Sequence, residues 1–321
     1  MTLLEKPKQP KGNTEQKLLL LSSTGTNNLI LCFGDNNHWI VRIPKRKYNA
    51  RQTTVDDYEK HIALHNLGLK GYGNIQLIKF RNLTRKTNKV GVYLCTYDEV
   101  LDIESIDKSA VLALIMPRYD SDLFDAYKWG ILHQRSRFLI TLFQIYDSLK
   151  GFHENNLVHL DLKPENILIN RNGDLIIEDL DTVSSHRDLT CKSGTKETTP
   201  PCKLRRYIES GSIHHKEPAL FFDDIYAYIL IIAFMLGIND LNLIEKDDTN
   251  EMMLRKLKKE IIQTYHLRYP DKNLDQTFIN FINALTTNSL DDWESFGECG
   301  RDPRIVVEIF IQQLKESIKK N

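Results

Sequence analysis

The chain lacks the cysteine patterns of disulfide-rich and zinc-binding proteins. Its five cysteines are odd in number and widely separated, and none stands at metal-site spacing. The net charge is zero, so the overall field gives no argument for a nucleic-acid partner. The longest apolar run, 225–236, is too short to cross a bilayer, and no apolar signal segment follows Met1. These absences predict a cytoplasmic protein with no nucleic-acid partner and no transmembrane segment.

A short polar loop between apolar runs is the most informative segment present. Residues 158–169 place a His, an Asp, a Lys and an Asn at H-x-D-x-K-x-x-N spacing. Phosphoryl transfer needs a carboxylate to orient the attacking hydroxyl, a cation near the transferred group and oxygen ligands for a metal. Asp161 is the candidate base, Lys163 the candidate cation and Asn166 a candidate metal ligand.

A second candidate metal ligand follows where that chemistry requires one. Asp179 ends the β-prone run 175–178, thirteen residues after Asn166, so a hairpin would bring the two side chains to one metal. With this pair, the chain resembles the protein kinase superfamily. His159-Leu160-Asp161 stands where the family has His-Arg-Asp, and Asp179-Leu180-Asp181 stands where it has Asp-Phe-Gly.

The order of predicted elements agrees with this resemblance. Strands are expected over 29–33, 39–43, 75–78, 90–94 and 110–116, with a helix opening at 53, and helices over 138–153, 224–237, 251–265, 274–285 and 303–318. The resemblance implies an α+β fold with two lobes, a small β-rich one carrying helix C and a larger helical one. The expected limits are a flexible tail over 1–16, an N-lobe over 17–116, a hinge over 117–121 and a C-lobe over 122–321.

The resemblance also implies a cation on the third strand, braced by a carboxylate on helix C. Arg42 lies on the 39–43 strand, and Lys45 follows the strand-ending Pro44, so both remain candidates for the phosphate contact. We choose Arg42, because alternation places it on the face that carries Lys in the family. Glu59, on the predicted helix, is the candidate carboxylate. Exposed charges at Arg42 and Glu59 are the alternative interpretation.

Glycine is scarce where the family has its glycine-rich loop. Residues 22–28 contain only Gly25, and their Ser, Thr and Asn residues either cover phosphate or form an ordinary hairpin turn. Residues 114–119 resemble the hinge. There Met116 would lie beside the adenine, and the backbone through Arg118 and Tyr119 would pair with the base.

Several residues depart from the family pattern. Leu160 replaces an Arg that pairs with a phosphorylated activation segment, and Asp181 replaces a Gly. Asp224 fits the buried Asp of the family that pins the catalytic loop. Two basic clusters, at 187–216 and 255–268, are candidate sites for an anionic regulator such as an inositol phosphate or phospho-ligand. Acidic neighbours make solvated mixed-charge faces the alternative.

The resemblance implies an ATP-dependent serine/threonine protein kinase that uses Mg²⁺ or Mn²⁺ and acts on a protein substrate. Lys163 supports this class, because tyrosine kinases usually place Ala or Arg within that loop. The alternatives are a kinase for an inositol, choline or sugar, a weakly catalytic pseudokinase that binds nucleotide, and nucleotidyl transfer. The divergence and the Asn, Lys and Ile bias also resemble bacterial effector kinases delivered into host cytosol.

Overall fold

The structure is a computed structural model. It describes residues 15–22, 28–33, 38–44, 50–86, 91–107, 109–170, 172–189, 194–195, 198–200, 203, 218–238, 249–270, 272–287, 309, 311–312 and 316. The chain divides into two compact units, Met1–Asp120 and Ser121–Asn321. This boundary falls within the predicted hinge, 117–121.

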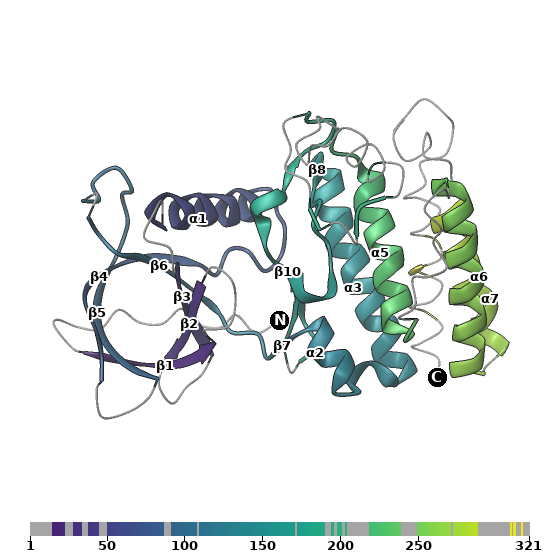
Figure 1. The fold of residues 1–321 in the computed structure, drawn as a ribbon, viewed down its shortest axis with the longest axis horizontal. Coiled ribbons are helices and arrows are strands. Elements are labelled where there is room, and N and C mark those ends of the chain that lie inside the picture. Colours follow the sequence, from purple (N-terminus) through teal and green to yellow (C-terminus); the bar gives the residue numbers. More distant parts are fainter. Residues whose placement is uncertain are drawn as a thin grey trace. The chain divides into compact units, whose positions relative to one another are not determined.

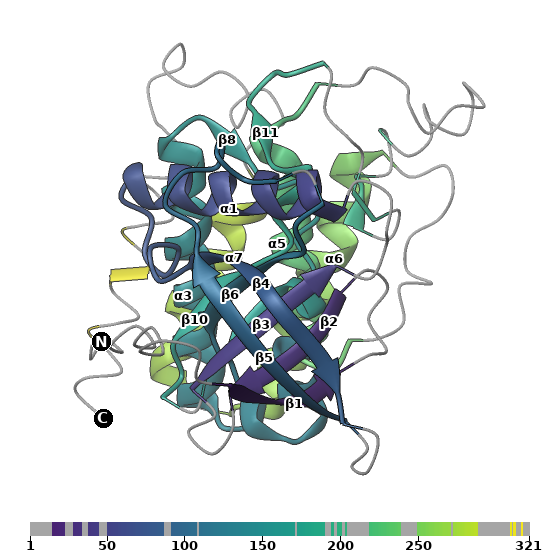
Figure 2. The ribbon, with the colours of Figure 1, turned by 90° about the vertical axis from the view of Figure 1, so that its left-hand side faces the viewer.

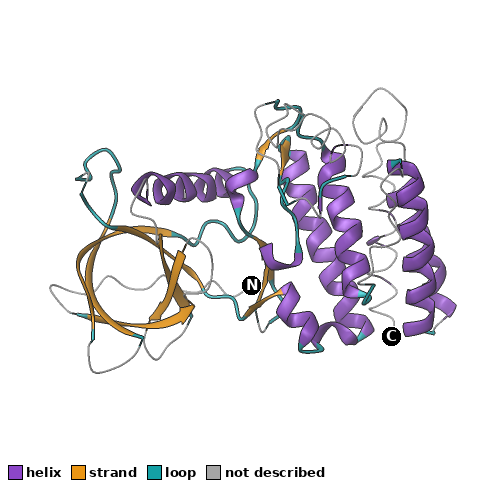
Figure 3. Cartoon of the chain, viewed as in Figure 1, coloured by secondary structure: helices purple, strands orange, loops and turns teal. Residues whose placement is uncertain are grey.

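Six strands of the N-terminal unit close into a barrel, which Figure 3 shows in orange. The strands are β1 (Gln16–Ser22), β2 (Asn28–Phe33), β3 (Trp39–Pro44), β4 (Gln76–Arg85), β5 (Val92–Glu99) and β6 (Leu112–Pro117). Their order around the barrel is β1-β2-β3-β6-β4-β5, with β1 pairing β5 to close it. The five expected strands are all present, and β3 ends at Pro44 as predicted. Closure leaves no free sheet edge.

The barrel has apolar side chains on both faces of β6. Ala113 and Ile115 lie in a cluster with residues of the other strands, including Leu31 and Val41. The alternate residues Leu112, Leu114 and Met116 pack in a second cluster with Val55 of α1. Because side chains alternate across a strand, a continuous apolar run such as β6 is buried on both sides.

Helix α1 (Ala50–Asn66) lies across the outside of the barrel (Figure 2). Its buried residues include Val55, which packs with residues of β4 and β6, and also Leu64, Asp57 and His61. The buried His61 Nδ1 lies 2.8 Å from the carbonyl oxygen of Asp57, one helical turn away. A carboxylate on the covered face of a helix requires a partner, and Asp57 has one, described with the site.

The C-terminal unit is mainly helical (Figure 1). Its helices are α2 (Leu123–Lys128), α3 (Arg135–Glu154), α5 (Phe221–Met235), α6 (Asn250–Arg268) and α7 (Lys272–Thr287), with short 3₁₀ turns η1 (Ile131–His133), η2 (Pro164–Asn166) and η3 (Leu180–Thr182). Four of the five predicted helices are confirmed; the fifth, 303–318, lies largely outside the described residues. Strands β7 (Ser121–Asp122), β8 (Leu157–Val158), β9 (Ile167–Ile169), β10 (Leu175–Ile177) and β11 (Ser184–Ser185) form two small sheets.

Helix α5 is apolar around most of its circumference and lies in the core of this unit. It packs beside α3, and its neighbours in the core cluster include Phe138, Leu142 and Leu257. Tyr228, fully buried, donates its hydroxyl to the carbonyl of Leu142 over 2.8 Å, so its polar end is satisfied. No helix in the described part of the chain combines the length and hydropathy needed to span a membrane.

The predicted hairpin that follows the catalytic loop is confirmed. Strands β9 and β10 pair antiparallel, with Ile167 opposite Ile177. The connecting turn is held by Asn170, whose side-chain oxygen accepts the Asp174 N–H at 2.9 Å. This pairing places Asn166, before β9, and Asp179, after β10, at the same end of the hairpin.

Candidate active site

The backbone of the 159–161 loop is fixed by a buried carboxylate on α5. Asp224 is completely buried, and its two oxygens accept the N–H groups of His159 at 2.8 Å and Leu160 at 2.9 Å. Leu160 has a φ of 67°, in the left-handed region that a residue with a side chain adopts only under constraint. The two hydrogen bonds to Asp224 supply that constraint, as expected from the resemblance.

The charge of Asp224 is kept inside the core by a histidine. His153 Nε2 donates to Asp224 Oδ2 at 3.0 Å, and both side chains are almost fully buried. Burial by itself would raise the pKa of Asp224, but the contact with His153 and the backbone donors outweigh it and lower that pKa. Asp224 is therefore ionised, and its two oxygens accept three donors.

His159 orients the loop in its neutral form. Its Nε2 lies 3.1 Å from the Glu178 carbonyl, which can only accept, so Nε2 carries the proton. Its Nδ1 accepts the Asp161 N–H at 3.3 Å. Complete burial lowers the pKa of His159, which agrees with the neutral ring. His159 thus joins the Asp161 backbone to the strand that leads to Asp179.

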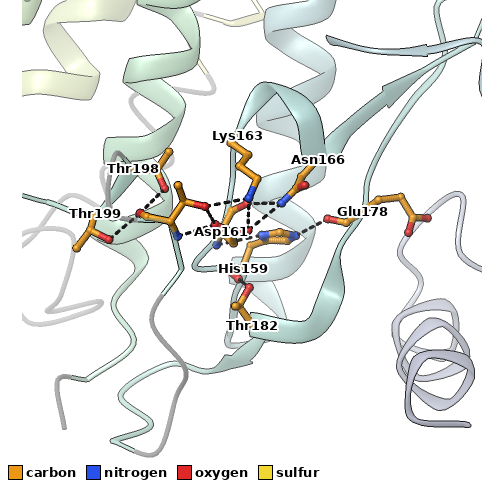
Figure 4. A network of polar contacts seen from close by, with 9 residues as sticks. His159, Asp161, Lys163, Asn166, Glu178, Thr182, Thr198 and Thr199 are labelled. Atoms are coloured by element: carbon orange, nitrogen blue, oxygen red, sulfur yellow. Dashed lines mark hydrogen bonds and ion pairs between the residues drawn. The ribbon is translucent and has the colours of Figure 1, made fainter. Parts of the chain in front are cut away.

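The Asp161 carboxylate is surrounded by donors on both oxygens (Figure 4). Oδ2 accepts from Lys163 Nζ at 2.8 Å and from Asn166 Nδ2 at 3.1 Å. Oδ1 accepts from the Thr195 N–H at 2.7 Å and from the Thr195 hydroxyl at 2.5 Å. Burial would raise the pKa of Asp161, but the hydrogen bonds from Lys163 and Thr195 lower it overall. The group is a fixed carboxylate that stays ionised in mild acid.

Thr195 is a site residue that the sequence reasoning did not identify. Lys163 Nζ donates to its hydroxyl at 2.9 Å, and the hydroxyl in turn donates to Asp161 Oδ1. The preceding Gly194 permits this approach, since a Cβ there would come within 1.9 Å of the Leu160 carbonyl oxygen. The single sequence signal was a Gly-Thr pair between Asp181 and α5, a pattern too common to single out.

Asn166 and Asp179 fit a divalent metal by their chemistry. Asn166 is buried and its amide nitrogen donates to the Asp161 carbonyl at 2.8 Å, which leaves its amide oxygen as a potential ligand. Asp179 is exposed and has a φ of 63°. Partial desolvation, then repulsion from Asp181 and Asp161, raises the pKa of Asp179. A cation would relieve this crowding of negative charge. Among the described residues, no cluster of three or more His, Cys, Asp or Glu side chains is arranged to hold a metal by itself.

The third-strand cation has a different partner from the one predicted. Arg42 of β3 forms an ion pair with Asp57 of α1, and both side chains are largely buried. Glu59, the predicted brace, is exposed. The prediction of Glu59 is therefore corrected to Asp57. Two residues turn a helix by about 200°, so Asp57 and Glu59 lie on opposite faces, and only Asp57 is on the covered face.

The other predicted nucleotide contacts are only partly visible. Gly25 and Lys45 lie outside the described residues. Met116 is buried in the cluster that includes α1, and Tyr119 is half-buried. The Arg118 N–H donates to the His38 carbonyl at 2.9 Å, so that donor is engaged within the N-terminal unit. The nucleotide contacts of Met116, Arg118 and Tyr119 remain predictions.

Several cationic side chains of the two predicted anion sites have partners within the protein. Lys203 is buried in an ion pair with Asp223. On α6, the exposed Arg255 lies 2.5 Å from Glu251, and Arg268 donates to the Met235 carbonyl at 3.0 Å. Most of 187–216 lies outside the described residues. The described part of each cluster therefore favours internal pairing over an assembled anion pocket.

The sequence and the fold both match known kinases. Residues 96–299 match the protein kinase domain model. The chain is 28% identical over 151 residues to a meiosis-specific serine/threonine-protein kinase of Schizosaccharomyces pombe (42% of this chain, 34% of the relative). It is 26% identical over 192 residues to a serine/threonine-protein kinase of Caenorhabditis briggsae (57% of this chain, 14% of the relative).

The similarity to a solved structure concerns the fold. A rhoptry kinase from Toxoplasma gondii matches with a TM-score of 0.54 and 12% identity, over 96% of this chain and 84% of that one. The chain spans between 14% and 62% of the length of the curated relatives it matches. The domain match nevertheless covers more than half of the chain, from the fifth barrel strand through the catalytic loop to beyond α7. The protein is a member of the protein kinase family.

Proposed function

We propose that the protein transfers the γ-phosphoryl group of ATP to a serine or threonine hydroxyl of a protein substrate. The observation that carries this proposal is the Asp161 carboxylate, held ionised between Lys163 and the Thr195 hydroxyl. A carboxylate with this environment is suited to accept a hydroxyl proton. The serine/threonine kinases among the relatives support the same acceptor class.

The proposed reaction balances around Asp161. The substrate hydroxyl oxygen forms a bond to the γ-phosphorus, the bond from that phosphorus to the bridging oxygen breaks, and ADP leaves. The hydroxyl proton passes to Asp161 and then to solvent. The two Asp161 carboxylate oxygens together accept four hydrogen bonds in this structure. The substrate hydroxyl would therefore replace the weakest of these four donors. That is the Asn166 contact, which at 3.1 Å is the longest of the four.

Lys163 and Thr195 have separate parts in this proposal. Lys163 places a positive charge beside Asp161, where the negative charge of the transferred phosphoryl group would develop. Thr195 fixes the Asp161 carboxylate through both its N–H and its hydroxyl, and so acts as a positioning residue. The Thr195 hydroxyl accepts a hydrogen bond from Lys163 and donates one to Asp161, so a residue without a hydroxyl would lose both contacts.

ATP and metal contacts are proposed for each unit by itself. Arg42, braced by Asp57, would contact the α- and β-phosphates. Asn166 and Asp179 would hold Mg²⁺ or Mn²⁺, which when bound would neutralise phosphate charge. An anionic activator at the basic clusters remains part of the proposal, with weaker support because several of those cations are paired. A cytoplasmic site of action, in host cytosol for a delivered effector, is likewise proposed.

A labelling assay tests the function. The chain is incubated with γ-labelled ATP, Mg²⁺ or Mn²⁺ and dephosphorylated casein, with and without inositol hexakisphosphate. We expect label on serine and threonine of casein after acid hydrolysis. Label on an inositol, choline or sugar would instead support a small-molecule kinase. Nucleotide binding with no transfer would support a pseudokinase, and α-labelled ATP incorporated into protein would support nucleotidyl transfer.

A further inference from the structure

Two adjacent carboxylates at the start of α5 hold two different segments. Asp224 binds the backbone of the catalytic loop. Asp223, one residue earlier, binds Lys203, which comes from the segment that follows Thr195. The first turn of α5 thus binds both the loop that carries Asp161 and the segment that carries Thr195. The link through Asp224 is a feature of the family, whereas the link through Asp223 and Lys203 is not implied by the family resemblance.

The Lys203–Asp223 pair is buried and hydrogen-bonded. Only 10% of the Lys203 side chain and 8% of the Asp223 side chain are exposed. Lys203 Nζ donates to Asp223 Oδ2 at 2.7 Å and to the Pro218 carbonyl at 2.9 Å. Asp223 Oδ2 also accepts the Leu220 N–H at 3.0 Å. Burying two charges costs desolvation free energy, so such a pair contributes more to fixing a geometry than to net stability.

Residues 186–188, which precede Thr195 in the chain, are held by backbone hydrogen bonds to Asn156 and Ala219. The His186 N–H donates to the Asn156 carbonyl at 2.9 Å. The Arg187 N–H donates to the Ala219 carbonyl at 2.7 Å, and the Ala219 N–H donates to the Asp188 carbonyl at 3.0 Å. The segment is therefore fixed near its start, at Thr195 and again at Lys203, and none of these contacts needs a phosphate.

The position of the phosphate-pairing Arg of the family is apolar here. Leu160 replaces the phosphate-pairing Arg and packs against Val158, Ala219 and Phe221. The His186 ring stacks on Phe221 with centroids 3.9 Å apart. Packing of this kind would be opposed by a doubly charged phosphate, because the phosphate would lose its hydration among apolar groups.

We propose that Lys203 is a positioning residue whose buried ion pair with Asp223 holds the Thr195 segment against the catalytic loop, so that phosphotransfer requires no phosphate on residues 184–217. This inference rests on the proposed phosphotransfer function for its kinetic part. Its structural part, the order of the segment around Thr195, can be measured without activity.

The test uses the full chain, co-expressed with a protein phosphatase and shown by intact mass to carry no phosphate. Lys203→Met, Lys203→Arg and Asp223→Asn are compared with wild type. Lys150→Met is the matched control, because Lys150 forms a half-exposed pair with Glu154 at 3.6 Å on α3. Transfer to dephosphorylated casein gives kcat and the KM values for casein and ATP. Hydrogen–deuterium exchange follows residues 194–200.

We expect unphosphorylated wild type to be active. Lys203→Met should lower kcat/KM for casein by roughly 10–100-fold, because small displacements of positioning groups have effects of that size, and should leave the KM for ATP within about twofold. Exchange at 194–200 should rise in Lys203→Met and not in Lys150→Met. Lys203→Arg should recover most of the activity, since it keeps the charge. Asp223→Asn keeps an oxygen that can accept the Leu220 N–H, and its loss of kcat/KM for casein should be intermediate. It replaces Lys203→Met as the test variant if Lys203→Met does not fold.

Two results would overturn the proposal. One is a wild-type protein that transfers phosphate only after residues 184–217 are phosphorylated. The other is Lys203→Met, or Asp223→Asn in its place, with a lower melting temperature but unchanged casein kinetics and unchanged exchange at 194–200. A wild type inactive in every state would instead refute the proposed function, and the exchange comparison would still decide the role of Lys203.

Discussion

The two units fix their candidate functional residues by different kinds of contact, through the main chain in one and through a side-chain ion pair in the other. In the C-terminal unit, Asp224 binds backbone N–H groups, so the loop that carries Asp161 is fixed through its main chain. In the N-terminal unit, Arg42 is held by a side chain, that of Asp57. Main-chain contacts demand a particular local sequence and conformation. A side-chain pair can change both members together and keep its charge, which makes it harder to identify from one sequence.

The largest expected effect is the fall in kcat when Asp161 is replaced. Asp161→Asn should lower kcat for casein by about 10²–10⁴-fold, since it removes the proton acceptor while keeping the shape of the side chain. The dissociation constant for ATP, measured by calorimetry, should change little. Asn172→Asp, in the β9–β10 turn, is a surface control for the reverse change. Equal transfer by Asp161→Asn and wild type would remove Asp161 from the mechanism.

The next largest expected effect is the loss of stability when Asp224, which binds the main chain of His159 and Leu160, is replaced. Asp224→Asn offers one acceptor oxygen in place of two and leaves buried donors of His159, Leu160 or His153 unmatched. The free energy of unfolding should fall by about 3 kcal/mol or more, as for other broken buried charge contacts. Chemical denaturation measures this, and Asp147→Asn, an exposed carboxylate on α3, is the control. A loss below about 0.5 kcal/mol would contradict a fixed main-chain anchor.

A double-mutant cycle would sharpen the comparison for the side-chain pair. Arg is longer than Lys, and Asp is shorter than Glu, so Arg42 with Asp57 spans much the same length as the Lys–Glu pair of the family. Arg42→Lys and Asp57→Glu should each raise the KM for ATP by roughly 10-fold, and the double variant should recover most of the loss. Glu59→Gln should behave as wild type. Additive losses in the double variant would show that the two residues do not act as a pair.

The smallest effect concerns acid stability of the C-terminal unit. Burial lowers the pKa of His186 to about 4, followed in size by repulsion from Arg187 and His153. The unfolded chain binds this proton near pH 6.5, so the contribution of His186 to stability is complete above pH 6.5 and is lost as pH falls toward 4. His186→Phe keeps the stack on Phe221 and should reduce the fall in melting temperature between pH 7 and pH 5, by on the order of 1–3 °C. His266→Phe on α6 controls for the added ring, and an unchanged fall in His186→Phe would refute the assignment.

Local motifs were predictable because each residue type has a direct chemical reason for its place. The loop residues Asp161, Lys163 and Asn166 were identified from spacing, and the structure brings them into one network. The same holds for Asp224, whose position at the start of an apolar helix was informative. Asp57 was missed, because the choice between it and Glu59 depends on which face of α1 the barrel covers, and the helix sequence has acidic residues on both faces.

The sequence alone indicated the family, five of the six barrel strands, four helices of the C-terminal unit and the spacing of Asp161, Lys163 and Asn166, since these depend on short-range periodicity and motif spacing. Tertiary structure decided the partners of those residues. Thr195 lies 34 residues from Asp161, Asp223 lies 20 from Lys203, and Asp57 lies 15 from Arg42. Contacts over such separations depend on how buried faces pack, and no local pattern in the chain encodes that packing.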